Sequence, residues 1–285
     1  MEIPRLNGII KALESGKNAA VCFQPAEPAS AIAVATEKYD GVLFEMEHGA
    51  YDPRALRDAL QYMINRRQIV ESGSLAPQVT PMVRIPVNGA EMNQFIAKQV
   101  LDMGVFGVVW PHVSTVEEAR NCVAACRYAR PDTAPRLEPK GQRGDGPTTA
   151  ARYWGLSQQE YYQRADVWPL DPKGEILVGI MCEDVVGLKN LPKILKEVPG
   201  IGVVIIGEGD LSQNLGFPRQ YEHPTVVAAM NEILAACKEA NVACGHPHVE
   251  ADNVEKVVGA GYRWLMPRPG RSNAVLDKAM KLSGR

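Results

Sequence analysis

Two apolar runs end abruptly in acidic residues: Ile176-Leu-Val-Gly-Ile-Met-Cys-Glu-Asp184 and Val203-Val-Ile-Ile-Gly-Glu-Gly-Asp210. Runs that are apolar on both faces are typical of parallel strands covered by helices. A carboxylate at the end of a buried strand must be paired, protonated or bound to a metal, because an uncompensated charge is unfavourable there. The two stretches therefore predict neighbouring parallel strands whose ends form a candidate site for a divalent cation with oxygen ligands.

The same alternation of apolar runs and amphipathic patterns extends along the chain. The predicted strands are residues 20–24, 41–47, 80–86, 105–111, 175–183, 202–207, 242–247 and 263–267. The predicted helices between them are residues 29–39, 53–66, 89–103, 115–129, 186–197, 224–240, 250–260 and 271–282. Strands separated by single helices indicate parallel pairing through crossover helices.

Eight such units close most naturally into a (β/α)8 TIM barrel of the α/β class, plugged at one end by an N-terminal helix over residues 6–15. We predict one barrel domain over residues 1–285, with residues 130–174 as a long insertion between the fourth helix and the fifth strand. Its aromatic residues favour a helix or two there over disorder. An open doubly wound sheet is the main alternative, but the turn after the first strand, Gln24-Pro-Ala-Glu-Pro28, lacks the glycines of a dinucleotide site.

Composition excludes several classes of partner. With 46% apolar residues, 22% charged residues and a formal net charge of -2, the chain has no electrostatic case for binding nucleic acid or an anionic membrane. No signal-peptide pattern and no membrane-length apolar segment is visible, so we expect a cytoplasmic protein. Six cysteines are scattered, and the one close pair, Cys122 and Cys126, fits buried free thiols better than a zinc site.

In a barrel of this kind the active site lies at the carboxyl ends of the strands. Glu183 and Asp210 are interpreted as ligands of Mg²⁺ or Mn²⁺, with structural ion pairs to Arg84 or Arg268 as the alternative. His48, which follows two acids, is interpreted as a general base. The ionisable residues expected at this rim are Glu45, Glu47, His48, Arg84, His112, Glu183, Glu208, Asp210, His246, His248 and Arg268.

Arg84 is a candidate fork for a substrate carboxylate, or it merely neutralises the acidic rim. A Schiff-base mechanism needs a lysine that projects from a strand, and no lysine falls in the predicted strands. A serine nucleophile elbow and a P-loop are also absent from the sequence. The absence of a strand lysine disfavours lysine-dependent aldol chemistry.

Several motifs follow one another in the order of a known family. They are Glu47-His48-Gly, Val83-Arg84-Ile-Pro, Leu101-Asp102-Met-Gly104, Pro111-His112-Val, Gly141-Gln-Arg143-Gly, Glu183 and Gly207-Glu-Gly-Asp210-Leu-Ser-Gln-Asn-Leu-Gly216. From about residue 20 to residue 265 the chain resembles the metal-dependent class II pyruvate aldolases, the HpcH/HpaI aldolase family. This family includes 4-hydroxy-2-oxoheptanedioate aldolase, 2-dehydro-3-deoxyglucarate aldolase and, more distantly, macrophomate synthase.

The resemblance implies a carbon–carbon lyase that reversibly cleaves a 4-hydroxy-2-oxo acid to pyruvate and an aldehyde through a metal-stabilised pyruvate enolate. It implies that Glu183 and Asp210 hold Mg²⁺ or Mn²⁺, with Co²⁺ as a further choice. His48 would be the acid/base group, acting through water, and Arg84 would hold the pyruvate oxygens. The other expected substrate contacts are Glu45, Gly209, Asp210 and Arg143.

The resemblance also implies a homo-oligomer, either a trimer or a hexamer of paired trimers, and leaves open that the C-terminal helix is exchanged between subunits. Glu45 replaces the usual aspartate, Met181 replaces a glutamine, and Glu208-Gly209 replaces a usual Pro-Ala pair. These departures surround the aldehyde half of the pocket and leave the aldehyde undefined.

Three alternatives remain. The same enolate could serve an oxaloacetate decarboxylase or an enzyme like macrophomate synthase. A non-catalytic barrel is disfavoured by the intact metal and base residues. Coenzyme A chemistry of the citrate lyase kind would need a basic cluster that the sequence does not show.

Overall fold

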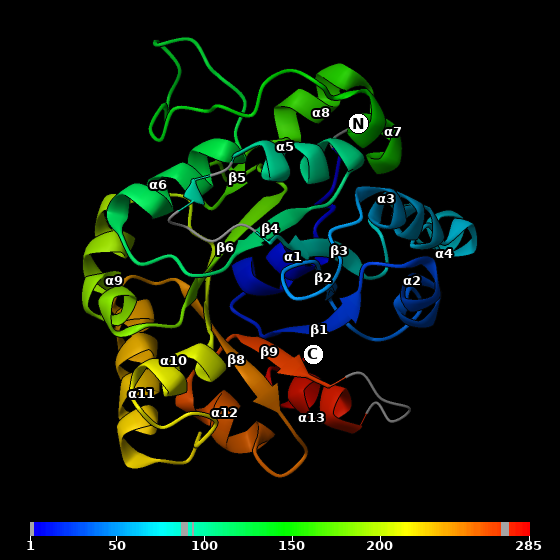
Figure 1. The fold of residues 1–285 in the computed structure, drawn as a ribbon. Helices are drawn as coiled ribbons and strands as arrows, with labels where there is room; N and C mark the ends of the chain where they lie inside the picture. The colour runs from blue at the N-terminus through cyan, green and yellow to red at the C-terminus, as the bar shows by residue number, and fades with distance from the viewer. Residues whose placement is uncertain (1–2, 87–90, 93, 269–273) are drawn as a thin grey trace.

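A closed parallel barrel forms the centre of the molecule (Figure 1). The computed structural model describes residues 3–86, 91–92, 94–268 and 274–285. The strands pair in the order β4-β3-β2-β1-β9-β8-β7-β6, and a further pairing between β6 and β4 closes the ring. The barrel strands are β1 (Ala19–Pro25), β2 (Gly41–Glu45), β3 (Thr80–Arg84), β4 (Gly107–Trp110), β6 (Ile176–Cys182), β7 (Val203–Ile206), β8 (Ala243–Val249) and β9 (Trp264–Pro267). The predicted TIM barrel and its eight strands are confirmed.

Alternation along each strand separates two apolar layers, because successive side chains point to opposite faces. The layer inside the barrel includes Leu43, Met82 and Leu177, while the layer under the helices includes Val42, Val83 and Val178. The N-terminal helix α1 (Gly8–Glu14) belongs to the inner layer through Ile9, Ile10, Ala12 and Leu13.

The side chain of Asn7 caps α1 by accepting hydrogen bonds from the backbone amides of Ile9 and Ile10. It also donates to the carbonyls of Phe106 and Glu175, at the amino ends of two strands. The helix therefore plugs the end of the barrel opposite the predicted site, as expected from the sequence.

The outer helices follow the predicted pattern with two differences. They are α2 (Pro28–Val34), α3 (Pro53–Tyr62), α4 (Arg66–Ser72), α5 (Gln94–Met103), α6 (Val116–Ala125), α9 (Val185–Glu197), α10 (Glu208–Asn214), α11 (Pro224–Glu239), α12 (Val254–Ala260) and α13 (Ala274–Leu282). The helix predicted over residues 53–66 ends at Tyr62, and a separate helix that was not predicted, α4, begins at Arg66, where Asn65 caps it by accepting from the amide of Gln68. Helix α10 was not predicted. The first residues of the predicted helices 89–103 and 271–282 lie outside the described residues.

The insertion, residues 130–174, contains α7 (Thr148–Trp154), α8 (Gln158–Arg164) and a short strand, β5 (Val167–Trp168), that pairs with the start of β6. Trp154 stacks on Phe106 with ring centroids 4.3 Å apart, and its indole donates to the carbonyl of Gly104. The aromatic residues thus anchor the two helices at the amino end of β4, which confirms the expectation of an ordered insertion.

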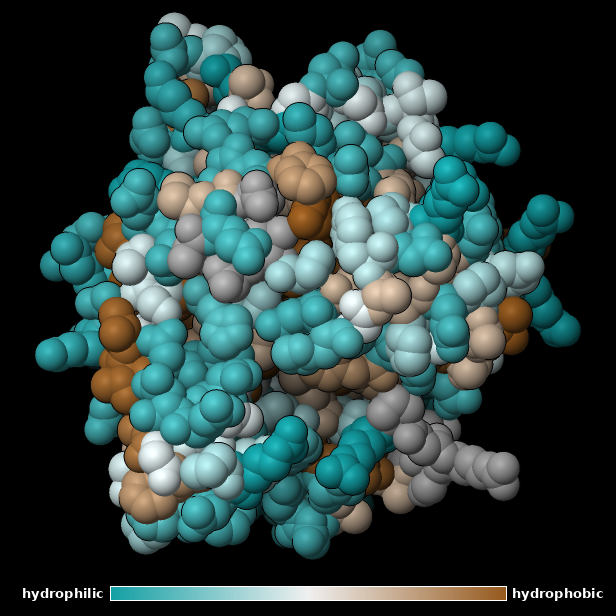
Figure 2. Space-filling view, in the orientation of Figure 1, coloured by the Kyte–Doolittle hydropathy of each residue, from teal (hydrophilic) through white to brown (hydrophobic). Residues whose placement is uncertain are grey.

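Most of the surface seen in Figure 2 is hydrophilic, and its apolar residues are scattered. Within the described part of the chain, no helix has the length and apolar character needed to cross a membrane. All six cysteines are buried free thiols, as predicted, and burial raises the pKa of the Cys22 and Cys126 thiols to about 12.

Candidate metal and substrate site

The last residues of β2 and β3, Glu45 and Arg84, are register partners at the carboxyl end of the barrel. The preceding residues Phe44 and Val83 pack under the helices, so Glu45 and Arg84 face the barrel mouth. The same alternation places Glu183 on the inside, because Cys182 before it belongs to the outer layer. We call Glu45, Glu47, Arg84, His112, Glu183 and Asp210 the inner cluster.

Arg84 is the only arginine or lysine of the inner cluster, and two acids hold it. Its Nε donates to Glu45 Oε2 at 2.7 Å, its Nη2 contacts the same oxygen, and Nη1 forms an ion pair with Glu47 Oε2 at 2.8 Å. Its guanidinium also lies 4.7 Å from the centre of the Phe23 ring. The other oxygen of Glu45 accepts from the backbone amides of Glu47 and His48, at 2.7 and 3.0 Å. Glu45 therefore fixes both Arg84 and the turn that carries His48.

Glu183 is a buried carboxylate whose nearest basic side chain is the imidazole of His112, 3.5 Å away. Its side chain is 1% exposed, and burial raises its pKa from 4.5 to about 7. Gly207 makes room for it, since a Cβ at Gly207 would lie 2.1 Å from Glu183 Oε2. Among the residues that the structure describes, no lysine or arginine lies within 4.0 Å of the carboxylates of Glu183 or Asp210. The structure therefore does not show the alternative to a metal site, in which Glu183 and Asp210 form ion pairs with Arg84 or Arg268.

His112, Glu183 and Asp210 present ligand atoms that all lie within 4.8 Å of one another. Nδ1 of His112 is 3.5 Å from Glu183 Oε1, and Asp210 enters from the first turn of α10. With its four carboxyl groups and its guanidinium ionised and His112 neutral, the inner cluster has an excess of three negative charges. A buried carboxylate that has no lysine or arginine partner among the described residues, and that lies beside a second carboxylate, fits a divalent cation with oxygen ligands.

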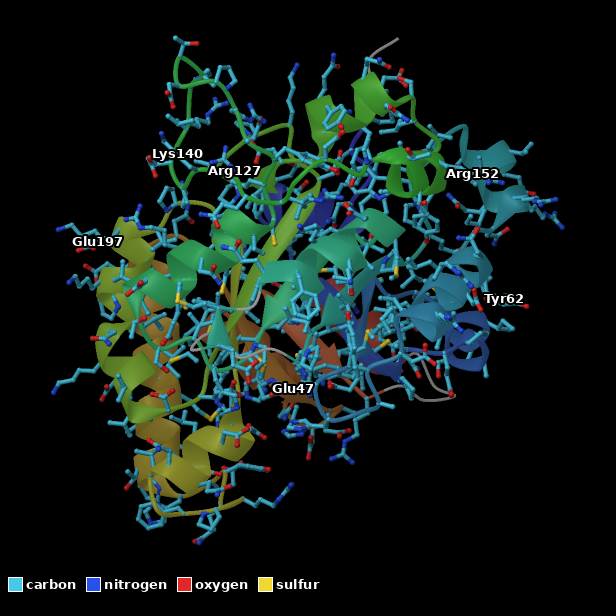
Figure 3. The ribbon with its side chains drawn as sticks, turned by 45° about the horizontal axis from the view of Figure 1, so that its top comes forward. Glu47, Tyr62, Arg127, Lys140, Arg152 and Glu197 are labelled. Atoms are coloured by element: carbon cyan, nitrogen blue, oxygen red, sulfur yellow. The ribbon has the colours of Figure 1, made fainter. Side chains whose placement is uncertain are left out.

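Glu47 and His112 had been placed at the rim by sequence, without assigned roles. The side chain of Glu47 is 10% exposed, and burial raises its pKa more than Arg84 lowers it. Its Oε1 lies 3.8 Å from Nε2 of His112, and its Oε2 lies 3.7 Å from Nε2 of His48. Figure 3 shows Arg127 and Lys140 at the end of the molecule that carries the insertion, and Glu47 well apart from both. The signal for Glu47 and His112 in the sequence was their position directly after apolar strands.

His48, the predicted general base, is open to solvent, with 68% of its side chain exposed. It lines a small cavity of about 260 Å³ together with Gly209, Asp210, Gln213, Pro218 and Arg219. The structure thus brings the predicted base and the predicted substrate-binding residues Gly209 and Asp210 to one hollow beside Glu183. Glu45 and Arg84 lie in the neighbouring inner cluster.

Arg143 is not brought to this cluster. It is fully buried, donates to Asp102 Oδ1 at 2.8 Å and to the hydroxyl of Tyr161 at 2.7 Å, and lies 4.5 Å from the centre of the Tyr128 ring. These partners belong to α5, to the segment that follows α6, and to the insertion. The expectation that Arg143 contacts the substrate does not fit this position, because its guanidinium is enclosed by the packing of the insertion.

Four other predicted rim residues lie on the outside of the barrel wall. Glu208, His246, His248 and Arg268 line a cleft of about 360 Å³, which we call the outer cleft, against side chains of α11 and α12. Nδ1 of His248 contacts Glu208, while His246 packs edge-on against Tyr262, with ring centroids 4.9 Å apart. Burial lowers the pKa of His246. The expectation that all these residues meet at one rim is corrected, since the face of β8 that carries Cys244 and His246 points away from the interior.

Comparisons with known proteins identify a family that matches most of this chain. The family described as HpcH/HpaI aldolase/citrate lyase matches residues 19–265. The chain is 32% identical to 2-keto-3-deoxy-L-rhamnonate aldolase of Klebsiella pneumoniae over 232 residues, which are 81% of this chain and 74% of that protein. It is 30% identical to hydroxypyruvate/pyruvate aldolase of Roseobacter denitrificans over 261 residues, 91% of this chain and 90% of that one.

Solved structures agree on the fold. An HpcH/HpaI aldolase/citrate lyase family protein from Burkholderia cenocepacia has a TM-score of 0.74 at 23% identity and covers 96% of both chains. Macrophomate synthase has a TM-score of 0.67 at 24% identity and covers 97% of this chain and 88% of its own. At this identity the two structures support the barrel and nothing finer.

Proposed function

Since the chain belongs to the HpcH/HpaI aldolase/citrate lyase family, we propose that it is a metal-dependent carbon–carbon lyase that reversibly cleaves a 4-hydroxy-2-oxo acid to pyruvate and an aldehyde. The family supports a lyase that acts on a 2-oxo acid. The observation that carries the finer proposal is the convergence of Glu183 and Asp210 next to Arg84, at the mouth of a barrel without a strand lysine.

Glu183 and Asp210 would hold the cation, either Mg²⁺ or Mn²⁺, with Co²⁺ as a further choice. When bound, the cation supplies Lewis-acid stabilisation to the carboxylate and keto oxygens of the substrate and to the pyruvate enolate left when the C3–C4 bond breaks. The burial of Glu183 supports this assignment, because a desolvated carboxylate attracts a cation more strongly than a solvated one.

Arg84 would bind the carboxylate and keto oxygens of the 2-oxo acid. Glu45 and Glu47 hold its guanidinium between β2 and β3, so its remaining N–H groups are oriented before substrate arrives. Backbone amides of Gly209 and Asp210 would face the substrate carboxylate in the hollow that they share with His48.

His48 would take the proton of the C4 hydroxyl through a water molecule and return it in the synthetic direction. Its exposure keeps it in contact with solvent, and its backbone amide is fixed by Glu45. Glu47 Oε2 lies 3.7 Å from Nε2 of this ring.

The test is the release of pyruvate from a panel of 4-hydroxy-2-oxo acids, including 2-keto-3-deoxy-L-rhamnonate, the substrate in the name of one relative. Oxaloacetate is assayed beside them. We expect release to require added Mn²⁺ or Mg²⁺, to stop on chelation and to return with the metal. Activity that survives chelation, or an imine trapped by borohydride, contradicts the proposal. Faster turnover of oxaloacetate than of every 4-hydroxy acid selects the decarboxylase alternative.

We further propose a homo-oligomer, a trimer or a hexamer, on the basis of the family alone. Sedimentation of the purified chain tests it, and a monomer at micromolar concentration contradicts it.

A further inference from the structure

We propose that His112 is a third protein ligand of the catalytic cation, and that the site consequently prefers Mn²⁺ or Co²⁺ to Mg²⁺. The inference rests on the proposed function, because it concerns the same cation. It adds a nitrogen donor to the two carboxylates, and imidazole suits the later first-row metals, whereas Mg²⁺ prefers oxygen ligands and water.

The positions of the three donors support a shared ion. Nδ1 of His112 is 3.5 Å from Glu183 Oε1, and the ligand atoms of His112, Glu183 and Asp210 all lie within 4.8 Å of one another. Around an ion with bonds of roughly 2.1 Å, adjacent ligand atoms lie about 3 Å apart and opposite ones about 4.2 Å apart. Small side-chain rotations therefore bring all three donors into one coordination shell.

The backbone directs the ring of His112 to this place. His112 has a φ of 50°, in the left-handed region that is uncommon for residues other than glycine, and its amide donates to Glu183 Oε1. The turn after β4 thus folds back toward the end of β6. One residue of this turn both fixes the carboxylate of Glu183 and presents its own imidazole next to it.

Glu47 supplies what a metal-bound histidine requires on its other side. A histidine ligand usually donates its second ring N–H to a carboxylate, which fixes the tautomer and orients the ring. Nε2 of His112 lies 3.8 Å from Glu47 Oε1, while Nδ1 faces Glu183. At 3.8 Å this pair is longer than a hydrogen bond, and a small rotation of the Glu47 side chain would close it into a carboxylate–histidine–metal arrangement.

A protonated His112 that simply neutralises Glu183 is the rival interpretation. The two differ in one observable, a bond between nitrogen and the metal. We would load the chelator-treated full-length protein with Mn²⁺ and record electron spin echo envelope modulation. We expect modulation from a directly bound ¹⁴N in the wild-type chain, lost in His112→Gln and kept in His48→Gln, whose histidine lies at the same mouth. A wild-type spectrum without bound ¹⁴N overturns the inference, whether or not the variant folds.

Metal affinity gives a second readout. We expect His112→Gln to weaken Mn²⁺ binding at least about 100-fold and Mg²⁺ binding by about tenfold or less, and Glu47→Gln to weaken Mn²⁺ binding about 10- to 100-fold. Equal losses for both metals in His112→Gln contradict the inference. If Mn²⁺ binds through Glu183 but without a nitrogen signal, only this inference fails. If no metal binds and pyruvate release survives chelation, the proposed function itself fails.

Discussion

The inner cluster and the outer cleft use the same kinds of side chain on opposite sides of the barrel wall. Asp210 joins Glu183 and His112 inside, while Glu208, two residues earlier, contacts His248 outside. Residues two apart in a helix point in nearly opposite directions, about 200° apart, so the first turn of α10 sends these acids to different places. The comparison teaches that a position next to a ligand in sequence does not make a residue part of the site.

The inner cluster and the outer cleft also differ in how their charged side chains are paired. The inner cluster has an excess of acids and leaves Glu183 without a lysine or arginine partner within the described residues. In the outer cleft Glu208 contacts His248, and Arg268 lies 3.4 Å from Glu250. The first region is thus set up to attract a cation, whereas in the second Glu208 and Arg268 each lie against another titratable side chain.

Removing one buried carboxylate from each region should separate them most clearly. We expect Glu183→Gln to lower the rate of pyruvate release by about 10³-fold or more and to abolish metal binding, because the uncharged amide is a poor ligand. The matched change Glu208→Gln should stay within about threefold of the wild-type rate. Initial rates at saturating Mn²⁺ and the metal content of both variants decide this. Comparable losses in the two variants would remove the distinction between the regions.

Two arginines allow a second matched test. Lysine keeps the charge of Arg84 but not its fork, so Arg84→Lys should lose about 10²-fold in kcat/KM for the 2-oxo acid. Arg268→Lys, in the outer cleft, should change kcat/KM by about twofold or less. Full activity of Arg84→Lys would show that its part is only to neutralise the acidic mouth.

Glu183 in the inner cluster and His246 in the outer cleft should make the free energy of unfolding of the metal-free chain depend on pH in opposite directions. Because the folded-state pKa of Glu183 is raised from 4.5 to about 7, its contribution to the free energy of unfolding is present below about pH 4.5 and is lost as the pH rises through 7, by about 3 kcal/mol. The pKa of His246 is lowered below 6.5, so its contribution is present above pH 6.5 and is lost as the pH falls through the lowered value.

Urea unfolding between pH 4.5 and 8 measures this. Glu183→Gln should flatten the loss toward high pH, and His246→Gln should flatten the loss toward low pH. An unchanged pH profile in Glu183→Gln would show that its carboxyl group titrates normally in the folded chain.

The strands and the ionisable residues at their ends could be predicted from sequence, because most buried strands are apolar runs followed by a polar residue at the mouth. The direction of each side chain was harder to predict. A shift of one residue in a strand end moves a side chain to the other face, so His246 and His248 could not be assigned to a side from their spacing alone. The structure shows the side of His246, because Cys244, two residues earlier in β8, packs in the outer layer.

Helix α10 was not predicted, and Arg143 was predicted at the wrong place, for other physical reasons. Gly207 and Gly209 have low helix propensity, so the acidic stretch looked like a strand end, although Glu208 and Asp210 in the first turn favour a helix start. The burial of Arg143 depends on tertiary packing between the insertion and α5, which local patterns do not encode.

The smallest effect we expect is the coupling within the outer cleft itself. If Glu208 and His248 are a structural pair, Glu208→Gln and His248→Gln should each lower the free energy of unfolding by about 1–2 kcal/mol, and the double variant should lose about 1 kcal/mol less than the sum. Pyruvate release should stay within about threefold of wild type in all three. Additive losses would mean that the contact contributes nothing to stability, and a large loss of activity in His248→Gln alone would make the outer cleft part of the site.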